Sequence, residues 1–538
     1  MKVLLVALNA QYMHVNLALR QILCCLKPGQ ASLYEGHINL PFRRVLEDIG
    51  REKPGAVGFS TYIWNAPMAW RLCRALKRAL PGVVLFAGGP QAESAPQAAF
   101  EDCGALDYVL RGEGEQVVGP FLEALAQGRD PAGLPGVCCL RQGAWVETPP
   151  PPPMAPEAWP QVWGQGRMAG LEGRILYVET SRGCPYRCAY CLSAGAGRVR
   201  ALEAGQAVER LTAMAEGGAG LIKLVDRTFN FDRQRAAQIW RGLIQHSRRT
   251  GLLPRYHFEI GAHLLDQESL EVLAQAPPGL FQFEAGIQSA NIQTLRAVGR
   301  DLPFEAVARP LERVRALGNI PLHTDLIAAL PLEDLAAFAR SFDQTYAIGA
   351  EMLQLGFLKV LPGSPLAGRV REWGIAYEPD PPYEALGTPW LSFEDLCLLK
   401  DVEAAVDWYH NSGRYPLALR YLLGARSPFA LFSHMARRLR AMGAFDVQRR
   451  ERERAGYLLE MFGRQPLGEL IAHDFLSRGL GAEIPPAAQQ AEDAQLRFLL
   501  RQKFHPVRGQ RARRYGWDVL AYEQGRPLVR RETVVFYA

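Results

Sequence analysis

The sequence lacks any long hydrophobic run and carries little net charge for its length. No apolar stretch approaches the roughly 18 residues that a membrane-spanning helix needs. The apolar start of the chain, residues 1–15, passes into polar residues without a small-residue cleavage site, so we expect a buried first strand there and not a signal peptide. The net charge of +6 over 538 residues neither demands nor excludes an acidic partner. We therefore expect a cytoplasmic protein that does not contact a membrane.

The composition is that of a globular protein, with 48% apolar and 22% charged residues. The length exceeds what one hydrophobic core supports and predicts two to four domains. Seven of the ten cysteines lie in apolar surroundings, as adjacent pairs or singly, and in a reducing cytoplasm they are expected to be buried thiols; they are Cys24, Cys25, Cys73, Cys103, Cys138, Cys139 and Cys397.

The first part of the chain, residues 1–147, alternates short apolar segments with amphipathic ones such as 69–80. This alternation is typical of a parallel, doubly wound α/β sheet, in which ligands bind at the carboxyl ends of the strands. Residues 133–147 predict a hairpin around Gln142 and Gly143. The predicted strands are 2–8, 55–61, 83–89 and 108–115.

Residues 148–172 form the clearest linker, with five consecutive prolines at 149–153. Such a tract favours an extended spacer. The strand–helix alternation resumes over 173–378 and predicts a partial (β/α)6 barrel with its chemistry on the loops after the strands. The predicted barrel strands are 174–181, 220–226, 257–262, 280–287, 322–330 and 352–361.

Residues 379–538 predict a mostly helical domain that finishes in short strands. The segment 508–517 gathers basic and aromatic residues. A solvated face explains it better than contact with nucleic acid, so we do not expect a nucleic-acid partner.

Three cysteines fall within eight residues directly after the first predicted barrel strand: Cys184, Cys188 and Cys191. Closely spaced thiolates in a loop can hold an iron–sulfur cluster. Zinc is the competing metal, but structural zinc sites usually use two paired spacings and a fourth ligand, and no second pair lies nearby. A cluster held by three cysteines leaves one iron open to a ligand with an amino and a carboxylate group.

The segment CPYRCAYC resembles the signature of the radical S-adenosylmethionine (SAM) superfamily. Segments 224–232, 283–289, 325–334 and 358–366 resemble its later strands, in the family's order. The resemblance implies that a 4Fe–4S cluster on the three cysteines, which act as both catalytic and metal-binding residues, cleaves SAM reductively. The resulting 5′-deoxyadenosyl radical would abstract a hydrogen atom from a substrate, with flavodoxin or ferredoxin as the electron donor.

The same resemblance implies which side chains contact SAM. Tyr190 and Ile327 would lie near the adenine, and Glu284 and Gln288 would contact the sulfonium ligand. The second barrel strand lacks the Gly-Gly-Glu of many members and offers Asp226 or Arg227 for the methionine end.

Residues 1–147 resemble the cobalamin-binding module of the same superfamily through segments 58–65, 87–93 and 111–115. The Asp-x-His-x-x-Gly pattern of histidine-ligated cobalamin is missing, so no histidine on cobalt is expected, and Tyr62, Ile63 or Trp64 would crowd the lower face. The resemblance implies cofactor contacts from Ser60, Thr61, Gly88, Gly89, Pro90 and Glu113. Residues 390–415 resemble a C-terminal domain of unknown function found on bacterial members of this group.

Together these features predict a cobalamin-dependent radical SAM enzyme that methylates an unactivated carbon of a small molecule or peptide. Cyclisation or rearrangement without methyl transfer is an alternative with the same cofactors. RNA methylthiolation would need a second set of cluster cysteines, which Cys24, Cys25, Cys73 and Cys103 do not resemble. A non-catalytic cobalamin or redox sensor is the alternative of another class.

Overall fold

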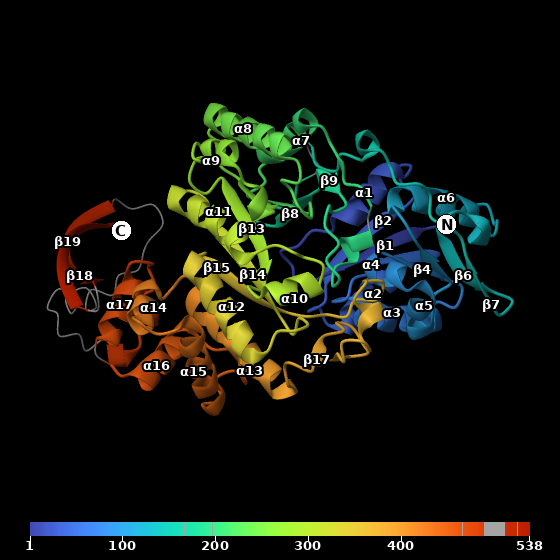
Figure 1. Ribbon diagram of the computed structural model, residues 1–538. Coiled ribbons are helices and arrows are strands. Elements are labelled where there is room, and N and C mark those ends of the chain that lie inside the picture. The colour runs from blue at the N-terminus through green and yellow to red at the C-terminus, as the bar shows by residue number, and fades with distance from the viewer. Residues whose placement is uncertain (165–167, 196, 465, 489–511, 524–525, 538) are drawn as a thin grey trace. The chain divides into compact units, whose positions relative to one another are not determined.

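The computed structural model describes residues 1–164, 168–195, 197–464, 466–488, 512–523 and 526–537 (Figure 1). The chain divides into two compact units. The first unit comprises Met1–Gly286, Leu295–Leu322 and Phe357–Pro389, and the second comprises Ile287–Thr294, His323–Gly356 and Trp390–Ala538. The first unit therefore contains the predicted N-terminal domain together with the first three barrel strands and residues 281–286 of the fourth.

The N-terminal sheet has seven strands in the order β2-β1-β3-β4-β5-β6-β7. Strands β1 to β5 are parallel, and the β6–β7 hairpin joins the edge antiparallel, as the doubly wound prediction and the predicted hairpin require. One strand, β2, was absent from the prediction because few of its side chains are buried. The bounds are β1 Val3–Asn9, β2 Ser32–His37, β3 Ala56–Ser60, β4 Val84–Gly88, β5 Tyr108–Leu110, β6 Val137–Arg141 and β7 Ala144–Glu147.

Helices cover both faces of this sheet (Figure 1). On one face α1 (Leu17–Cys25) and α6 (Gly114–Ala126) pack over an apolar layer that includes Leu5 and Phe86. On the other face α2 (Phe42–Arg51), α3 (Ala66–Ala79) and α5 (Pro96–Cys103) enclose a second apolar layer. A sheet buried on both faces explains why its central strands are continuous apolar runs.

The second sheet contains all six predicted barrel strands, in the order β15-β14-β13-β12-β11-β8, which is an open, partial barrel. In the first unit, Tyr256 and Phe258 on β12 are buried, and Phe258 packs against Trp240 of α8. The strands are β8 Ile175–Val178, β11 Leu221–Leu224, β12 Arg255–Glu259, β13 Phe281–Gln288, β14 Leu322–Ala328 and β15 Met352–Phe357. The larger helices are α7 Ala204–Glu216, α8 Arg233–Thr250, α9 Gln267–Leu273, α11 Phe304–Leu317 and α12 Leu335–Ile348.

The C-terminal part of the second unit is mostly helical, as predicted. Its helices are α13 Phe393–Val406, α14 Pro416–Leu423, α15 Pro428–Ala441, α16 Glu451–Phe462 and α17 Leu467–Leu476. A hairpin of β18 (Ala512–Glu523) and β19 (Arg526–Tyr537) follows. Residues 508–511 of the predicted basic–aromatic segment lie outside the described residues. Within the described part of the chain, no helix combines the length and apolarity needed to cross a membrane.

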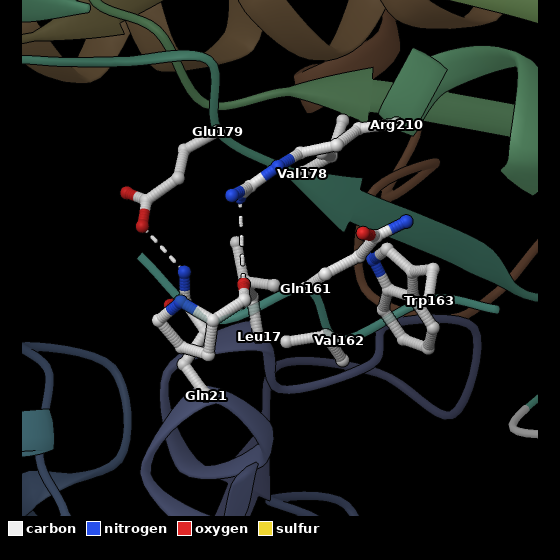
Figure 2. A pocket seen from close by; sticks show the side chains of 9 residues that line it. Leu17, Gln21, Gln161, Val162, Trp163, Val178, Glu179 and Arg210 are labelled. Carbon is white, nitrogen blue, oxygen red and sulfur yellow. Dashed lines mark hydrogen bonds between the residues drawn. The ribbon is translucent and has the colours of Figure 1, made fainter. Parts of the chain in front are cut away.

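Residues 148–164 of the predicted linker are extended, with one short helical turn at Pro156–Ala158, but they are not a free spacer. Trp159 and Trp163 are buried, and the indole nitrogen of Trp163 donates a 2.7 Å hydrogen bond to the carbonyl of Tyr177 on β8. Figure 2 shows this segment between Leu17 and Gln21 of α1 and the β8 strand, around a cavity of about 20 Å³. A cavity of this size holds about one water molecule. We call residues 154–163 the linker strap.

Candidate functional site

The three predicted cluster cysteines lie on one loop between β9 (Ser181–Arg182) and β10 (Arg200–Ala201), which pair antiparallel. Cys188 is buried, and Cys184 and Cys191 are half-buried. The backbone N–H of Ser193 donates to the sulfur of Cys191 at 3.4 Å, and the sulfur of Cys184 lies 3.6 Å from the hydroxyl of Thr228. Hydrogen bonds to the sulfurs are among the features that tune iron–sulfur clusters.

The middle of the cysteine loop is fixed by backbone contacts. The N–H of Ala189 donates to the carbonyl of Val298, and its carbonyl accepts from the N–H of Leu366, both at 2.8 Å. Gly299, with φ +72°, passes so close that a Cβ there would lie 3.0 Å from the carbonyl oxygen of Arg187. The loop is thus held in one shape by segments more than 100 residues downstream.

Aromatic side chains flank the thiols. Tyr190 is half-buried, and burial together with the neighbouring Cys188 thiol raises its pKa. The hydroxyl of Tyr186 lies 2.7 Å from Nε2 of His263, which follows β12. Burial, and then the charge of Arg300, lowers the pKa of His263, so this imidazole is neutral at pH 7. Both tyrosines therefore provide neutral walls next to the thiols.

Asp226 lies at the end of β11, as expected, but its side chain is fully buried. Its carboxylate accepts hydrogen bonds from the N–H and hydroxyl of Thr180 and from the hydroxyl of Ser181, at 2.5–2.8 Å. Through these hydrogen bonds Asp226 links the chain after β11 to the chain after β8. Arg227, the alternative for the methionine end, is exposed.

Glu284 lies on β13 within a set of charged side chains from neighbouring strands. Its carboxylate accepts from Nε2 of His257 on β12 at 2.7 Å and from the ammonium of Lys223 on β11 at 3.1 Å. These two hydrogen bonds orient the carboxylate within the first unit.

The two remaining predicted SAM contacts belong to the second unit. Gln288 is the last residue of β13 and adopts φ +71°, and Ile327 is half-buried on β14. Ala329 and Leu332, in the connection after β14, also have positive φ values. Residues other than glycine rarely adopt this conformation, and clusters of such residues occur at functional sites.

The N-terminal domain has a cavity of about 420 Å³ at the carboxyl ends of its strands, on the face covered by α1 and α6. Its apolar part is lined by Leu5, Leu19, Ile22, Phe86, Leu110, Val117 and Val118. Of the predicted cobalamin contacts, it is lined by Ser60, Gly88, Gly89, Pro90 and Glu113. Among the described residues that line it, none is a histidine. An apolar slot beneath a glycine-rich rim fits the nucleotide tail of a corrinoid.

Thr61 is fully buried and does not line this cavity. Its hydroxyl donates to the carbonyl of Gly88 at 2.8 Å and accepts from the N–H of Ala92 at 3.2 Å. Gly89 has φ +96°, and a Cβ there would lie 2.8 Å from the carbonyl oxygen of Thr61. The glycine is therefore required by a close backbone approach, and Thr61 supports the glycine turn from behind.

Tyr62 lines the cavity and stacks on Trp64, with ring centroids 4.3 Å apart and an interplanar angle of 9°. Burial raises the pKa of Tyr62, while the hydroxyl of Ser60 and the charge of Arg227 oppose the shift. The aromatic pair thus stands at the cavity rim with a neutral phenol.

Three family models match consecutive parts of the chain. Residues 3–121 match the B12 binding domain, residues 178–344 match the radical SAM superfamily, and residues 371–506 match a protein family of unknown function, DUF4080. Residues 178–344 are a radical SAM domain. A B12-binding domain precedes it, and a DUF4080 domain follows it.

A curated relative of this radical SAM protein is 2-(S-pantetheinyl)-carbapenam-3-carboxylate methyltransferase of Streptantibioticus cattleyicolor, 28% identical over 66% of this chain. The match spans 54% of that relative, so the chain covers about half of its length. The solved structure of the cobalamin-dependent SAM radical enzyme OxsB with aqua-cobalamin and SAM has a TM-score of 0.62, 15% identity, and coverage of 93% of this chain and 83% of that one. The methyltransferase TsrM from Kitasatospora setae, with cobalamin and a [4Fe-4S] cluster, has a TM-score of 0.57, 20% identity, and coverage of 69% and 74%. These structures confirm the fold.

The cavity of this radical SAM protein also has lining residues that sequence reasoning did not identify. Helix α1 contributes Ala18 and Gln21, and the radical SAM domain contributes Glu179 and Arg182. Arg182 and Glu179 belong to the ETSRGC segment, so their closeness to Cys184 in sequence was a usable signal. Nothing in the sequence indicates that α1 lies against the same cavity.

Proposed function

We propose that this protein is a cobalamin-dependent radical SAM methyltransferase that modifies an unactivated carbon of a small molecule or peptide. One observation carries the proposal. Within the first unit, the segment that leads into the cysteine loop also lines the cavity of the B12-binding domain. Glu179 and Arg182 line this cavity, and Cys184 follows two residues after Arg182.

In this proposal Cys184, Cys188 and Cys191 hold a 4Fe–4S cluster. SAM would be contacted by Tyr190, Glu284, Gln288 and Ile327, with Asp226 supporting the strand ends. Cobalamin would be contacted by Ser60, Gly88, Gly89, Pro90 and Glu113. When bound, these groups supply one-electron reduction of the sulfonium and a cobalt centre for methyl transfer.

The protein's own contribution is positioning and exclusion of water. Buried Asp226 fastens the strand ends that lead to the cysteine loop, and Tyr190 keeps a neutral, half-buried ring beside it. The Lys223 and His257 contacts orient Glu284. Such preorganised groups act without reorganising during the reaction.

We place the protein in the cytoplasm, where low-potential donors such as flavodoxin or ferredoxin would reduce the cluster. A reducing compartment suits thiol ligands and the other free cysteines of the chain. No nucleic-acid or membrane partner is part of the proposal.

Anaerobic reconstitution with iron, sulfide and cobalamin, followed by dithionite and SAM, tests the proposal. Wild-type protein should form 5′-deoxyadenosine and S-adenosylhomocysteine. The Cys184→Ala/Cys188→Ala/Cys191→Ala variant should lose bound iron and both products. Cys397→Ala, which removes an exposed thiol, is the matched control and should keep them. Deoxyadenosine without S-adenosylhomocysteine would favour rearrangement chemistry, and neither product from an iron- and cobalamin-loaded protein would favour a sensor.

A further inference from the structure

The cysteine loop starts and ends at two arginines that lie opposite each other. Arg182 on β9 and Arg200 on β10 are register partners in the two-stranded sheet, and the three cysteines lie on the chain between them. Both guanidinium groups lie over the ring of Trp159 in the linker strap, at 4.7 and 5.8 Å from its centroid. Like charges placed opposite each other across a sheet repel, so this arrangement requires a counter-charge.

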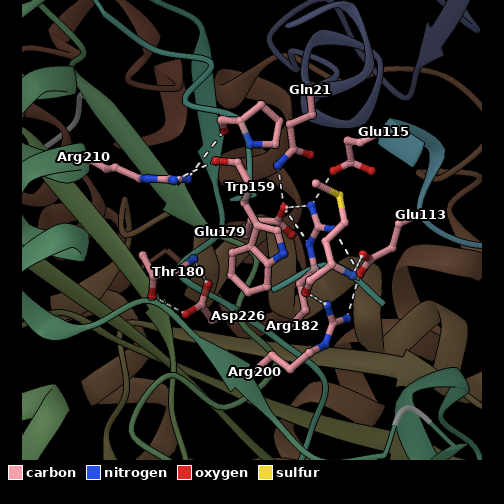
Figure 3. Close-up of polar contacts among 12 residues, drawn as sticks. Gln21, Glu113, Glu115, Trp159, Glu179, Thr180, Arg182, Arg200, Arg210 and Asp226 are labelled. Carbon is pink, nitrogen blue, oxygen red and sulfur yellow. Dashed lines mark hydrogen bonds and ion pairs between the residues drawn. The ribbon is translucent and has the colours of Figure 1, made fainter. Parts of the chain in front are cut away.

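Glu113 provides that counter-charge. One of its carboxylate oxygens lies 3.0 Å from Nη1 of Arg182 and 2.7 Å from Nη2 of Arg200 (Figure 3). Its other oxygen accepts from the N–H of Met154 at 2.6 Å. Although burial opposes the shift, the Arg200 and Met154 hydrogen bonds and the charge of Arg182 lower the pKa of Glu113. The carboxylate is therefore ionised at neutral pH.

Glu113 lies directly before α6 and also lines the cobalamin cavity. Arg182 makes further ion pairs at 2.5 Å with Glu115, in the first turn of α6, and with Glu179 at the end of β8. Its side chain is only 14% exposed, so solvent screens these pairs weakly. Both ends of the cysteine loop are thus tied to one wall of the cavity in the neighbouring domain.

The geometry points to Glu113, Arg182 and Arg200 as positioning residues that set the distance between the cluster and cobalamin. We call this group the arginine clasp. The inference rests on the proposed function, because it assigns the clasp a role between the two cofactors. Catalytic geometry is sensitive to such placement, since a displacement of about 1 Å can lower a rate roughly 100-fold.

Arg174 offers a matched control. It lies directly before β8 and binds the N-terminal domain there, at the end of β8 away from Glu179 and the cysteine loop. The guanidinium of Arg174 donates two hydrogen bonds to the carbonyl of Tyr12, at 2.6 and 2.9 Å. Arg174→Gln therefore removes an arginine contact between the same two domains at the end of β8 away from the cysteine loop. Loss of stability without loss of cofactor geometry is expected for it.

The test measures the distance between the reduced cluster and cob(II)alamin by pulsed dipolar EPR in wild type, Arg182→Gln, Arg200→Gln, Arg182→Lys and Arg174→Gln. Wild type and Arg174→Gln should give one narrow distance distribution. The Arg182→Gln and Arg200→Gln distributions should broaden, and Arg182→Lys, which keeps the charge, should be intermediate. S-adenosylhomocysteine formation should fall at least tenfold in the two glutamine variants, while deoxyadenosine formation falls less than threefold.

Unchanged, narrow distributions in both glutamine variants would overturn the inference, as would a proportional fall of both products. If Arg182→Gln does not fold, Arg200→Gln and Arg182→Lys decide the question. Failure of the proposed function itself has a different signature, because the wild-type protein would then lack the cobalt signal or form no S-adenosylhomocysteine.

Discussion

The hydroxyl of Thr180, four residues before Cys184, donates a 2.5 Å hydrogen bond to the buried carboxylate of Asp226. Replacing Asp226 by alanine would leave several buried donors without an acceptor and should lower the free energy of unfolding by about 3–5 kcal/mol. Asp226→Asn, which keeps one acceptor oxygen, should lose less. Urea unfolding measures the loss of stability in each variant, and the iron content after reconstitution shows whether the cysteine loop still binds the cluster.

The same variants separate a fastening role from a SAM contact. If Asp226 acts by holding the ends of β8 and β11, the folded fraction of Asp226→Asn should bind SAM with the wild-type Kd. A more than tenfold weaker Kd in a protein of near wild-type stability would instead indicate direct contact with the methionine group. Equilibrium dialysis with the reconstituted protein distinguishes these outcomes.

Gly89 should not tolerate a side chain. Its φ of +96° and ψ of 172° cost an alanine about 1–3 kcal/mol, and the added Cβ would lie 2.8 Å from the carbonyl oxygen of Thr61. Gly89→Ala should therefore displace the cavity rim and weaken cobalamin binding at least tenfold, as measured by absorbance titration. Gly82→Ala, where a Cβ meets nothing within 4 Å, should leave binding unchanged and alter stability by less than about 0.5 kcal/mol. Equal binding by the two variants would contradict this account of the rim.

Strand runs and the cysteine motif could be predicted because both are local patterns. The central strands of the first sheet are continuous apolar runs, and the three cysteines need only their own spacing. Strand β2 was not found, because at the sheet edge most of its side chains stay partly exposed and leave no such run. The family models match the B12 binding domain, the radical SAM superfamily and DUF4080 in that order along the chain.

Side-chain direction could not be predicted. Thr61 and Asp226 both occur where a strand ends, yet both point into the protein and bind backbone or hydroxyl groups there. The arginine clasp brings together Glu113, Arg182 and Arg200 from three separate segments. No spacing rule connects a residue before α6 with the two ends of a loop in another domain, so only the folded chain reveals it.

Glu333 predicts a pH dependence of the second unit. Burial raises its pKa to about 7, and the hydroxyls of Ser289 and Ser341 donate to it at 2.6 and 2.7 Å. A carboxyl group with a raised folded-state pKa stabilises the fold fully below its unfolded pKa of about 4.5, and this contribution is lost as the pH rises through 7. The difference corresponds to about 3 kcal/mol. The melting temperature of Glu333→Gln minus that of wild type should therefore be larger at pH 8 than at pH 5. A difference that does not vary with pH would contradict the assignment.

The linker strap should behave as part of the folded core. Trp163 is 4% exposed, and its indole N–H binds the carbonyl of Tyr177. Trp163→Phe removes that hydrogen bond but keeps most of the packing, and should cost about 1 kcal/mol. Trp163→Ala also opens a cavity between α1 and β8, and should cost about 3–5 kcal/mol. A flexible spacer would tolerate both changes equally. Denaturant unfolding of the two variants therefore decides whether the linker strap packs as part of the folded core or is only a flexible spacer between the two domains. Because the strap also supplies the Trp159 ring beneath the arginine clasp, the alanine variant should broaden the distance distribution between cluster and cobalamin more than the phenylalanine variant does.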